Sequence, residues 1–467
     1  MSDVETESVA VDLSPVEVYR RVDGRALLER GERGWRETYV ATDPVASFRY
    51  RRTDDGDGLE RLRAWLDSVG TGTYDTEAGA FGYVGYDVAK EIEDLPDDTV
   101  RDFDLPDIAF DCYDAVLKVR EGSVLIEAVD HGGRDGSPGE RVRELAERLR
   151  SDDGGHEAER DGRSRSAVRS SEVGSNFDRA DYLAAVETVK EYIREGDTFQ
   201  ANISQRLGFT SDASPLELYA ALRETNPGPY MGLLEYDGAA IVSSSPELLV
   251  RTEGRDLKAR PIAGTRPRGE TDRDDDDLRS ELTASEKERA EHSILVDLTR
   301  NDLGTVSTHG SVTVDRFMDV VPYAEVQHLE SVVAGELRDG KDLVDAIRAV
   351  FPGGTVTGAP KPRTLEIIEE VEPTERGPYT GSMGRIGLDG DATMNILIRT
   401  VVNEGDQFYL QVGGGVVHDS EPVAEYEETL QKAEGVLNAL ETSGRGDEGD
   451  QPSAARTGGP GGREGGR

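Results

Sequence analysis

Residues 407–433 read QFYLQVGGGVVHDSEPVAEYEETLQKA. The apolar run Gln407 to Val412 has the pattern of a strand, and the acidic segment after the glycines has helical spacing. We expect the strand to end in a turn at the glycine triplet 413–415, whose backbone N–H groups converge on an anion. An ordinary tight turn is the alternative. The helix carries Glu425 and Glu428, which are three residues apart and therefore share one face.

A second pair of acidic residues lies upstream, in the helical pattern Leu278 to Asp297, which carries Glu288 and Glu291. If the two helices face each other, their four carboxylates offer only oxygen ligands, the set that Mg²⁺ prefers. The lack of His and Cys at metal-ligand spacing disfavours zinc. Surface helices of an acidic protein also produce such pairs by chance, so a solvated surface is the alternative.

Four segments follow from the pattern along the chain. Residues 1–150 mix strand-like and helical runs, and 151–177 are polar and rich in Gly and Ser, which predicts a solvated linker. Helical spacing resumes at Asp178, and Gly196 is expected to end that first helix. Dense strand and helix patterns continue to residue 442, and the Gly-rich residues 443–467 predict a disordered tail.

The composition limits the partners. The 467 residues include 95 Asp and Glu against 54 Lys and Arg, a net charge of −41. Such a surface repels phosphate backbones and anionic lipids, which argues against nucleic-acid and membrane-surface roles. Acid in excess with few lysines is typical of a salt-adapted protein, and an ordinary acidic protein is the alternative.

Nucleophilic and redox chemistry have little support in the sequence. The single cysteine, Cys112, excludes an internal disulfide and a thiolate metal cluster, and it fits a reducing cytoplasm. It lacks the glycine-rich elbow that a glutaminase would need, so glutamine is not expected to react on this chain. The start of the chain has no signal-peptide pattern, and no apolar run is long enough to span a membrane.

Two histidines, His292 and His328, are candidates for a general acid or base. His292 follows Glu291 directly and therefore points to a different helix face. His328 lies in a strand-like segment, Tyr323 to Leu337, among apolar neighbours. Histidine is the most frequent general acid or base near neutral pH, but a single histidine in a strand is more often structural. The residues alone leave both interpretations open.

Ten ordered blocks between Gly196 and Ala433 resemble the chorismate-utilising enzymes, specifically the large component of anthranilate synthase or aminodeoxychorismate synthase. They include GDTFQANISQR from Gly196, SSSPELLVR from Ser243, EHSILVDLTRNDLG from Glu291 and GTVTGAPKPR from Gly354. So many blocks in order are far more specific than one short motif. The resemblance implies an α+β fold in which two large antiparallel sheets pack together with helices outside and the site lies between them.

The resemblance also implies a binding site for Mg²⁺ and chorismate, a dicarboxylate. Glu291 and Glu428 would bind the metal directly, and Glu288 and Glu425 would support it through water. The family pattern assigns further residues to substrate binding: Gly264, Thr265, Tyr379, Arg399, Gly413, Gly414, Gly415 and Lys432. Arg can hold a carboxylate with two parallel hydrogen bonds, which suits this anion pocket.

The resemblance implies the chemistry as well. Glu247 matches the general acid that protonates the departing C4 hydroxyl, and this role requires a raised pKa. His328 and Thr355 match residues at the ring and the leaving group, so His328 is a candidate proton carrier for pyruvate elimination. Gln200 stands where water-adding relatives carry a Lys base, so the resemblance implies an enzyme that adds ammonia.

The product is left open between two alternatives. Ala263 stands where relatives that make 4-amino-4-deoxychorismate usually have a nucleophilic Lys, which favours anthranilate. Against this, Asn202 and Gln205 look more like the folate-branch proteins. A separate glutaminase subunit would supply ammonia. A silent regulatory paralogue is a further alternative, although the implied catalytic residues are intact.

An amino-acid inhibitor site is equally open. Pro229, Tyr230 and Met231 match the tryptophan pocket of the family. Arg30, however, replaces the usual Ser of its sensing segment, which puts feedback inhibition by tryptophan in doubt.

Overall fold

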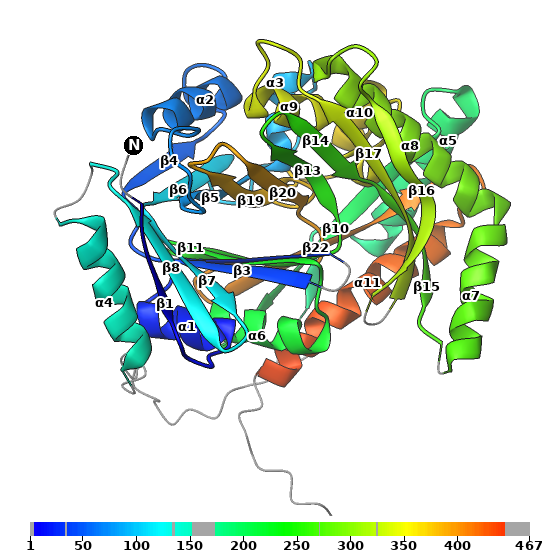
Figure 1. Cartoon of the computed structure of the whole chain (residues 1–467). Helices are drawn as coiled ribbons and strands as arrows, with labels where there is room; N and C mark the ends of the chain where they lie inside the picture. Colours follow the sequence, from blue (N-terminus) through cyan, green and yellow to red (C-terminus); the bar gives the residue numbers. More distant parts are fainter. Residues whose placement is uncertain are drawn as a thin grey trace, which may run out of the picture.

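The computed structural model describes residues 4–32, 35–132, 136–151, 173–269, 271–323 and 326–443. In this part of the chain, the strands form two large antiparallel sheets that lie face to face, with helices on the outer side of each (Figure 1). The predicted α+β class and layered fold are confirmed. Among the described helices, none is both long and apolar enough to cross a membrane.

The first sheet contains twelve strands within the described residues. In spatial order they are β1 (Val4–Val9), β8 (Ser123–Val129), β7 (Ala115–Arg120), β3 (Trp35–Ala41), β2 (Ala26–Glu32), β11 (Tyr230–Tyr236), β12 (Ala239–Ser245), β21 (Thr400–Glu404), β22 (Gln407–Val416), β10 (Gln200–Thr210) and β18 (Gly358–Ala359), and β9 (Gly174–Ser175) also pairs with β10.

The second sheet has ten strands in the same part of the chain. Their order is β15 (Ile262–Pro267), β17 (Val326–Glu336), β14 (Asp256–Arg260), β13 (Leu248–Glu253), β20 (Ala392–Ile396), β19 (Ser382–Gly387), β5 (Gly79–Val84), β6 (Ile108–Tyr113) and β4 (Ala46–Tyr50), and β16 (Thr313–Pro322) pairs with β17.

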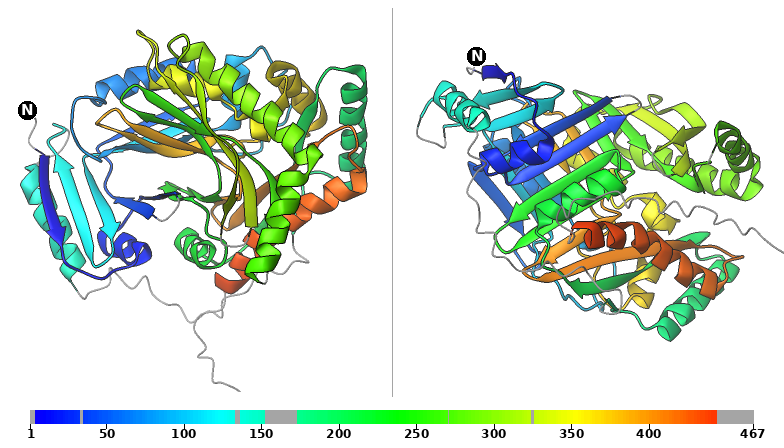
Figure 2. Two further views of the ribbon diagram at one scale, coloured as in Figure 1. Left: turned by 45° about the vertical axis from the view of Figure 1, so that its right-hand side comes forward. Right: turned by 90° about the horizontal axis from the view of Figure 1, so that it is seen from below.

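Helices cover the outer faces of both sheets. On the first sheet lie α1 (Pro15–Val22), α4 (Pro138–Arg150), α6 (Pro215–Thr225) and α11 (Pro422–Ser443), as the view from below shows (Figure 2). The other helices are α2 (Gly58–Ser68), α3 (Ala89–Ile92), α5 (Arg179–Glu195), α7 (Asp272–Ala284), α8 (Glu286–Val306), α9 (Leu343–Val350) and α10 (Lys361–Val371).

Local sequence explains several helix boundaries. Ser14 and Ser214 each cap a helix that has Pro at its first turn, and a Glu at the third position returns the hydrogen bond. Gly196 ends α5 in the left-handed conformation with φ +88°, so the predicted stop is confirmed. Buried apolar side chains fill the layer between each sheet and its helices, and a third core, which includes Tyr39, Phe81 and Met383, fills the space between the sheets.

Both sheets combine strands from before and after the predicted linker 151–177. Residues 1–150 contribute to each sheet beside strands of the later region, so the two regions share their cores. Within the predicted linker, residues 174–175 pair with β10 and Phe177 is buried. The rest of the predicted linker, 152–172, and residues 444–467 of the predicted tail lie outside the described residues.

Two local predictions were wrong. The triplet 413–415 does not form a turn, because β22 continues through it to Val416 and pairs with β10 along its whole length. A β-carbon would lie within 3 Å of polar side-chain atoms at Gly413 and Gly415, and it would make a tight contact of 3.2 Å with Glu425 at Gly414. The predicted helix from Leu278 to Asp297 is two helices, since Ser285 ends α7 and its side chain caps the start of α8.

Candidate active site

Glu247 lies in the turn between β12 and β13, where its side chain is buried. Burial raises the pKa of Glu247 to about 8, and the neighbouring Thr355 hydroxyl acts in the opposite direction. The backbone N–H of Ile262 donates to Glu247 Oε1 over 3.3 Å. At neutral pH this carboxyl therefore keeps its proton and can donate it.

A small cavity of about 20 Å³ lies against Glu247 and Thr355. This volume suffices for about one water molecule. Asp302 also lines the cavity and pairs with Lys361, whose Nζ lies 2.7 Å from Asp302 Oδ2. The cavity thus places polar groups beside the buried acid.

His328 lies on β17 and is buried. Its Nδ1 lies 3.0 Å from Thr265 Oγ1 and 3.2 Å from the carbonyl oxygen of Gly264. Burial, together with the nearby Arg399 charge, lowers the pKa of His328 to about 4. The ring is therefore neutral at pH 7, and the Gly264 carbonyl favours a proton on Nδ1. Nε2 is buried without a hydrogen-bond partner, so its lone pair is free to accept a proton.

Gly264 produces a bulge in β15 opposite His328. The pairing of β15 with β17 shifts register between Ala263 and Thr265, and Gly264 has φ +63°. An ideal β-carbon on Gly264 would lie 2.8 Å from Glu288 Oε2. The bulge therefore lets the strand that holds His328 Nδ1 approach the start of α8.

The predicted acidic pairs come from α8 and α11. Glu288 and Glu291 lie on α8, and Glu425 and Glu428 lie on α11. Burial raises the pKa of Glu291, and the charges of the other three glutamates raise it further against the opposing effect of Lys287. Burial also raises the pKa of Glu425. The two pairs of glutamates therefore lie close enough for their charges to shift the pKa of Glu291.

These carboxylates fit a hydrated cation. Among the described residues, no three of their oxygens come within 4.8 Å of one another, so they do not form a closed cage. Mg²⁺ is typically held by one or two carboxylates and keeps several waters. Arg266 lies 3.2 Å from Glu288, and Lys432 lies 2.7 Å from Glu428. The all-oxygen donors and the raised pKa values are consistent with a site that a divalent cation would stabilise.

The glycine triplet forms a bare section of β22. An ideal β-carbon on Gly413 would lie 2.7 Å from the Tyr379 hydroxyl, and one on Gly415 would lie 2.5 Å from Gln200 Nε2. An ideal β-carbon on Gly414 would lie 3.2 Å from Glu425 Oε2. Lys432 Nζ donates to the Gly413 carbonyl over 2.9 Å. Because side chains alternate along a strand, Gly413 and Gly415 make room for Tyr379 and Gln200 on one face of β22, and Gly414 makes room for Glu425 on the other.

Arg399 lies in the segment between β20 and β21, and its charge acts on His328. It adopts a left-handed backbone conformation with φ 51°, as does Thr380 with φ 59°. The two segments are joined because the Thr380 N–H donates to the Leu397 carbonyl over 2.8 Å. Burial lowers the pKa of Arg399, and no carboxylate pairs with its guanidinium in the described part of the chain. Such a guanidinium is suited to bind an anionic ligand.

Sequence reasoning gave no role to several polar groups near these residues. The half-buried Tyr323 ring lies 5.5 Å from the His328 ring between centroids. The Asp302–Lys361 pair and the Asn202 side chain also lie against the site. All but Tyr323 fall inside the resembling blocks, but only the folded chain shows which of them lie near the predicted residues.

The predicted tryptophan pocket lies at the pairing of β11 with β2. Pro229 precedes β11, and Tyr230 is opposite Arg30. The Tyr230 hydroxyl accepts a hydrogen bond from Arg260, while Arg30 pairs with Glu37 and donates to Thr393.

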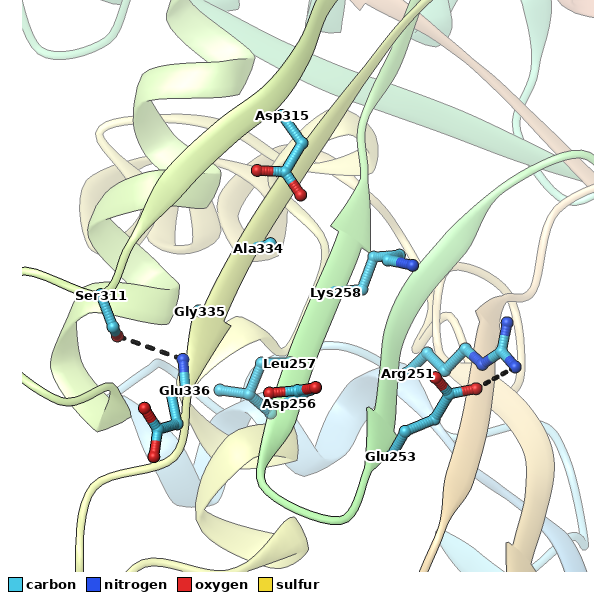
Figure 3. A pocket seen from close by; sticks show the side chains of 10 residues that line it. All are labelled: Arg251, Glu253, Asp256, Leu257, Lys258, Ser311, Asp315, Ala334, Gly335 and Glu336. Carbon is cyan, nitrogen blue, oxygen red and sulfur yellow. Dashed lines mark hydrogen bonds and ion pairs between the residues drawn. The ribbon is translucent and has the colours of Figure 1, made fainter.

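A larger pocket of about 400 Å³ lies elsewhere, on β13, β14 and β17 (Figure 3). Arg251 and Lys258 supply positive charge there, and Glu253, Asp256 and Asp315 supply negative charge. It contains none of the predicted site residues.

The chain belongs to the chorismate binding enzyme family, whose profile matches residues 24–438. It is 44% identical over 460 residues to an anthranilate synthase component 1 of Haloarcula marismortui, covering 94% of this chain and 91% of that one. It is 42% identical over 443 residues to aminodeoxychorismate synthase component 1 of Bacillus subtilis, covering 89% and 92%. The crystal structure of anthranilate synthase component I from Streptococcus pneumoniae superposes with a TM-score of 0.77 at 30% identity, covering 91% of this chain and 97% of that one.

Proposed function

We propose that this protein is the synthase component that converts chorismate and ammonia to anthranilate, pyruvate and water. The observation that carries the choice of product is Ala263, which lies beside the Gly264–His328 contact and has no amine to attack the ring. Free ammonia must then act as the nucleophile.

Glu247 and His328 divide the proton chemistry. Glu247 is protonated at neutral pH and donates to the C4 hydroxyl as it leaves as water, while ammonia adds at C2. Neutral His328 then accepts the C2 proton at its free Nε2 as pyruvate departs and the ring becomes aromatic. Thr265 and the Gly264 carbonyl hold the opposite ring nitrogen and fix the tautomer.

The substrate's two carboxylates have separate partners. The enolpyruvyl carboxylate would be bound by Arg399, Tyr379 and the backbone of β22 at Gly413 and Gly415, with Lys432 alongside. The guanidinium of Arg399, which pairs with no carboxylate among the described residues, supports this assignment.

Glu291 and Glu428 would hold Mg²⁺, with Glu288 and Glu425 in support. Bound there, the ion would supply positive charge that neutralises the ring carboxylate and favours the addition of ammonia. The position of all four side chains on α8 and α11 supports this assignment.

Ammonia would come from a separate glutaminase subunit, because the only cysteine of the chain, Cys112, is buried and burial raises its pKa to about 12. A cytoplasmic location fits this single reduced thiol. Arg30 occupies the position opposite Tyr230 in the strand pairing, which disfavours inhibition by tryptophan.

The second candidate is aminodeoxychorismate synthase, which is favoured by Asn202 and by the 42% identity to the Bacillus subtilis protein of that name. Purified protein, chorismate, Mg²⁺ and ammonium chloride in high salt decide between the two. Anthranilate, identified by fluorescence and mass after chromatography, supports the first. A 4-amino product that retains the enolpyruvyl group would replace it with the second, and no consumption of chorismate would favour a silent paralogue.

A further inference from the structure

Asn202 has a rigidly held backbone on β10. Its N–H donates to the Thr357 carbonyl over 2.7 Å, and its own carbonyl accepts from Arg376 Nη2 over 2.6 Å. Arg376 is fully buried and paired with Glu372. The direction in which the Asn202 side chain leaves the strand is therefore fixed.

The Asn202 side chain extends to the bare section of β22. An ideal β-carbon on Gly413 would lie 2.6 Å from Asn202 Oδ1 and 2.7 Å from the Tyr379 hydroxyl. Both polar groups therefore lie against the Gly413 α-carbon. Only glycine at this position leaves room for the two side chains.

The amide of Asn202 makes no hydrogen bond with the described residues. Oδ1 is buried without a partner, and Nδ2 is neither buried nor bonded. Gln205, three residues along the same strand, is the opposite case: its Nε2 donates to Thr429 and its Oε1 accepts from Ser175. A polar side chain beside a substrate site that makes no hydrogen bond within the protein is typical of a group that forms a hydrogen bond with a ligand.

The surroundings favour an anion as that ligand. Burial raises the pKa of Tyr379, so its hydroxyl stays a donor. Lys432 brings an ammonium group to the Gly413 carbonyl. A flip of the Asn202 amide exchanges Oδ1 and Nδ2 and brings an N–H beside the Tyr379 hydroxyl, and these two donors match the two oxygens of a carboxylate.

We propose that Asn202 is a further substrate-binding residue, whose Nδ2–H donates, beside the Tyr379 hydroxyl, to the side-chain carboxylate of the ring dicarboxylate. The inference rests on the proposed function and deepens it, because it predicts how the chain distinguishes a dicarboxylate from a monocarboxylate.

Two variants test the contact. Asn202→Asp keeps the shape but replaces the donor by a negative charge, and Asn202→Leu removes polarity. We expect each to raise KM for chorismate about tenfold or more while kcat changes less than threefold, since a hydrogen bond to a charged group is lost. Asn301→Asp, on the exposed side of α8, is the matched control for the charge change and should leave both constants unchanged.

Binding of a dicarboxylate and of a matching monocarboxylate, measured directly, tests whether Asn202 contacts the second carboxylate. Calorimetry with 3-(carboxymethoxy)benzoate and with 3-methoxybenzoate compares a dicarboxylate with its monocarboxylate counterpart. The wild type should prefer the dicarboxylate, and both Asn202 variants should lose that preference while they bind the monocarboxylate as before. An unchanged preference in either folded variant overturns the inference.

The same experiment separates two other outcomes. A rise in KM for ammonium alone would overturn the inference in favour of an Asn202 amide that holds the nucleophile. If the wild type neither binds the dicarboxylate nor consumes chorismate, the proposed function itself fails. Circular dichroism of each variant identifies loss of folding, and Asn202→Leu remains informative if Asn202→Asp does not fold.

Discussion

The Glu288 carboxylate lies against Gly264, so closely that a β-carbon on Gly264 would be 2.8 Å from Glu288 Oε2. Gly264 also supplies the carbonyl that holds His328 Nδ1. One glycine thus joins the strand beside the candidate base to the helix that carries two of the candidate metal ligands.

Gly264→Ala should disturb both neighbours. We expect kcat/KM for chorismate to fall about tenfold or more, because the new methyl group displaces Glu288 and the backbone at φ +63° becomes strained. Steady-state kinetics at several Mg²⁺ concentrations measures it. Gly340→Ala is the matched control, since Gly340 has φ +78° but open space around it. Equal effects of the two substitutions would contradict the contact argument.

Glu247→Gln should lower kcat by about 10²- to 10⁴-fold, the usual contribution of a general acid. In the wild type, kcat should fall as pH rises through about 8, because the acid form of Glu247 is lost there. A kcat–pH profile of both proteins checks this. Glu253→Gln, at the end of the following strand, is the control. A variant that keeps full activity, or the same alkaline decline in Glu247→Gln, would remove Glu247 from the mechanism.

Loss of a proposed metal ligand should weaken Mg²⁺ binding, which can be measured without following the reaction. Glu291→Gln and Glu428→Gln are each expected to weaken Mg²⁺ binding about tenfold or more, because each removes a carboxylate of the proposed site. Calorimetric titration of Mg²⁺ into each variant in the presence of chorismate measures this. Glu434→Gln, on the exposed side of α11, should behave as the wild type. Unchanged affinity in both site variants would argue against the four-glutamate site.

Asp87 predicts a pH-dependent stability unrelated to catalysis. Burial, with the charges of Glu375 and Glu369, raises the pKa of Asp87 to about 7. A carboxyl with a raised folded-state pKa stabilises the protein below its unfolded pKa near 4, and this contribution is lost as pH rises to about 7. The Tm of Asp87→Asn minus the Tm of the wild type should therefore increase by about 2–5 °C as the pH rises from 5 to 8. Calorimetry at constant salt checks it, and exposed Asp98→Asn should show no such trend.

The sequence predicted the layered fold, because long ordered blocks carry it, and the site residues that the same blocks imply stay predictions for the variants above to test. It did not predict the bare strand at 413–415, since a glycine run has the same appearance whether it forms a turn or admits neighbouring side chains. Ser285 was likewise hidden inside a continuous helical pattern. The free Nε2 of His328 and the unpaired amide of Asn202 depend on contacts between distant segments, which no local pattern encodes.

The most direct test is the stoichiometry of the reaction of wild-type protein with chorismate, Mg²⁺ and ammonium chloride in high salt. Anthranilate is measured by fluorescence, pyruvate by lactate dehydrogenase, and chorismate by absorbance. The account predicts one anthranilate and one pyruvate for each chorismate consumed. Consumption of chorismate with a 4-amino product and without pyruvate would contradict it.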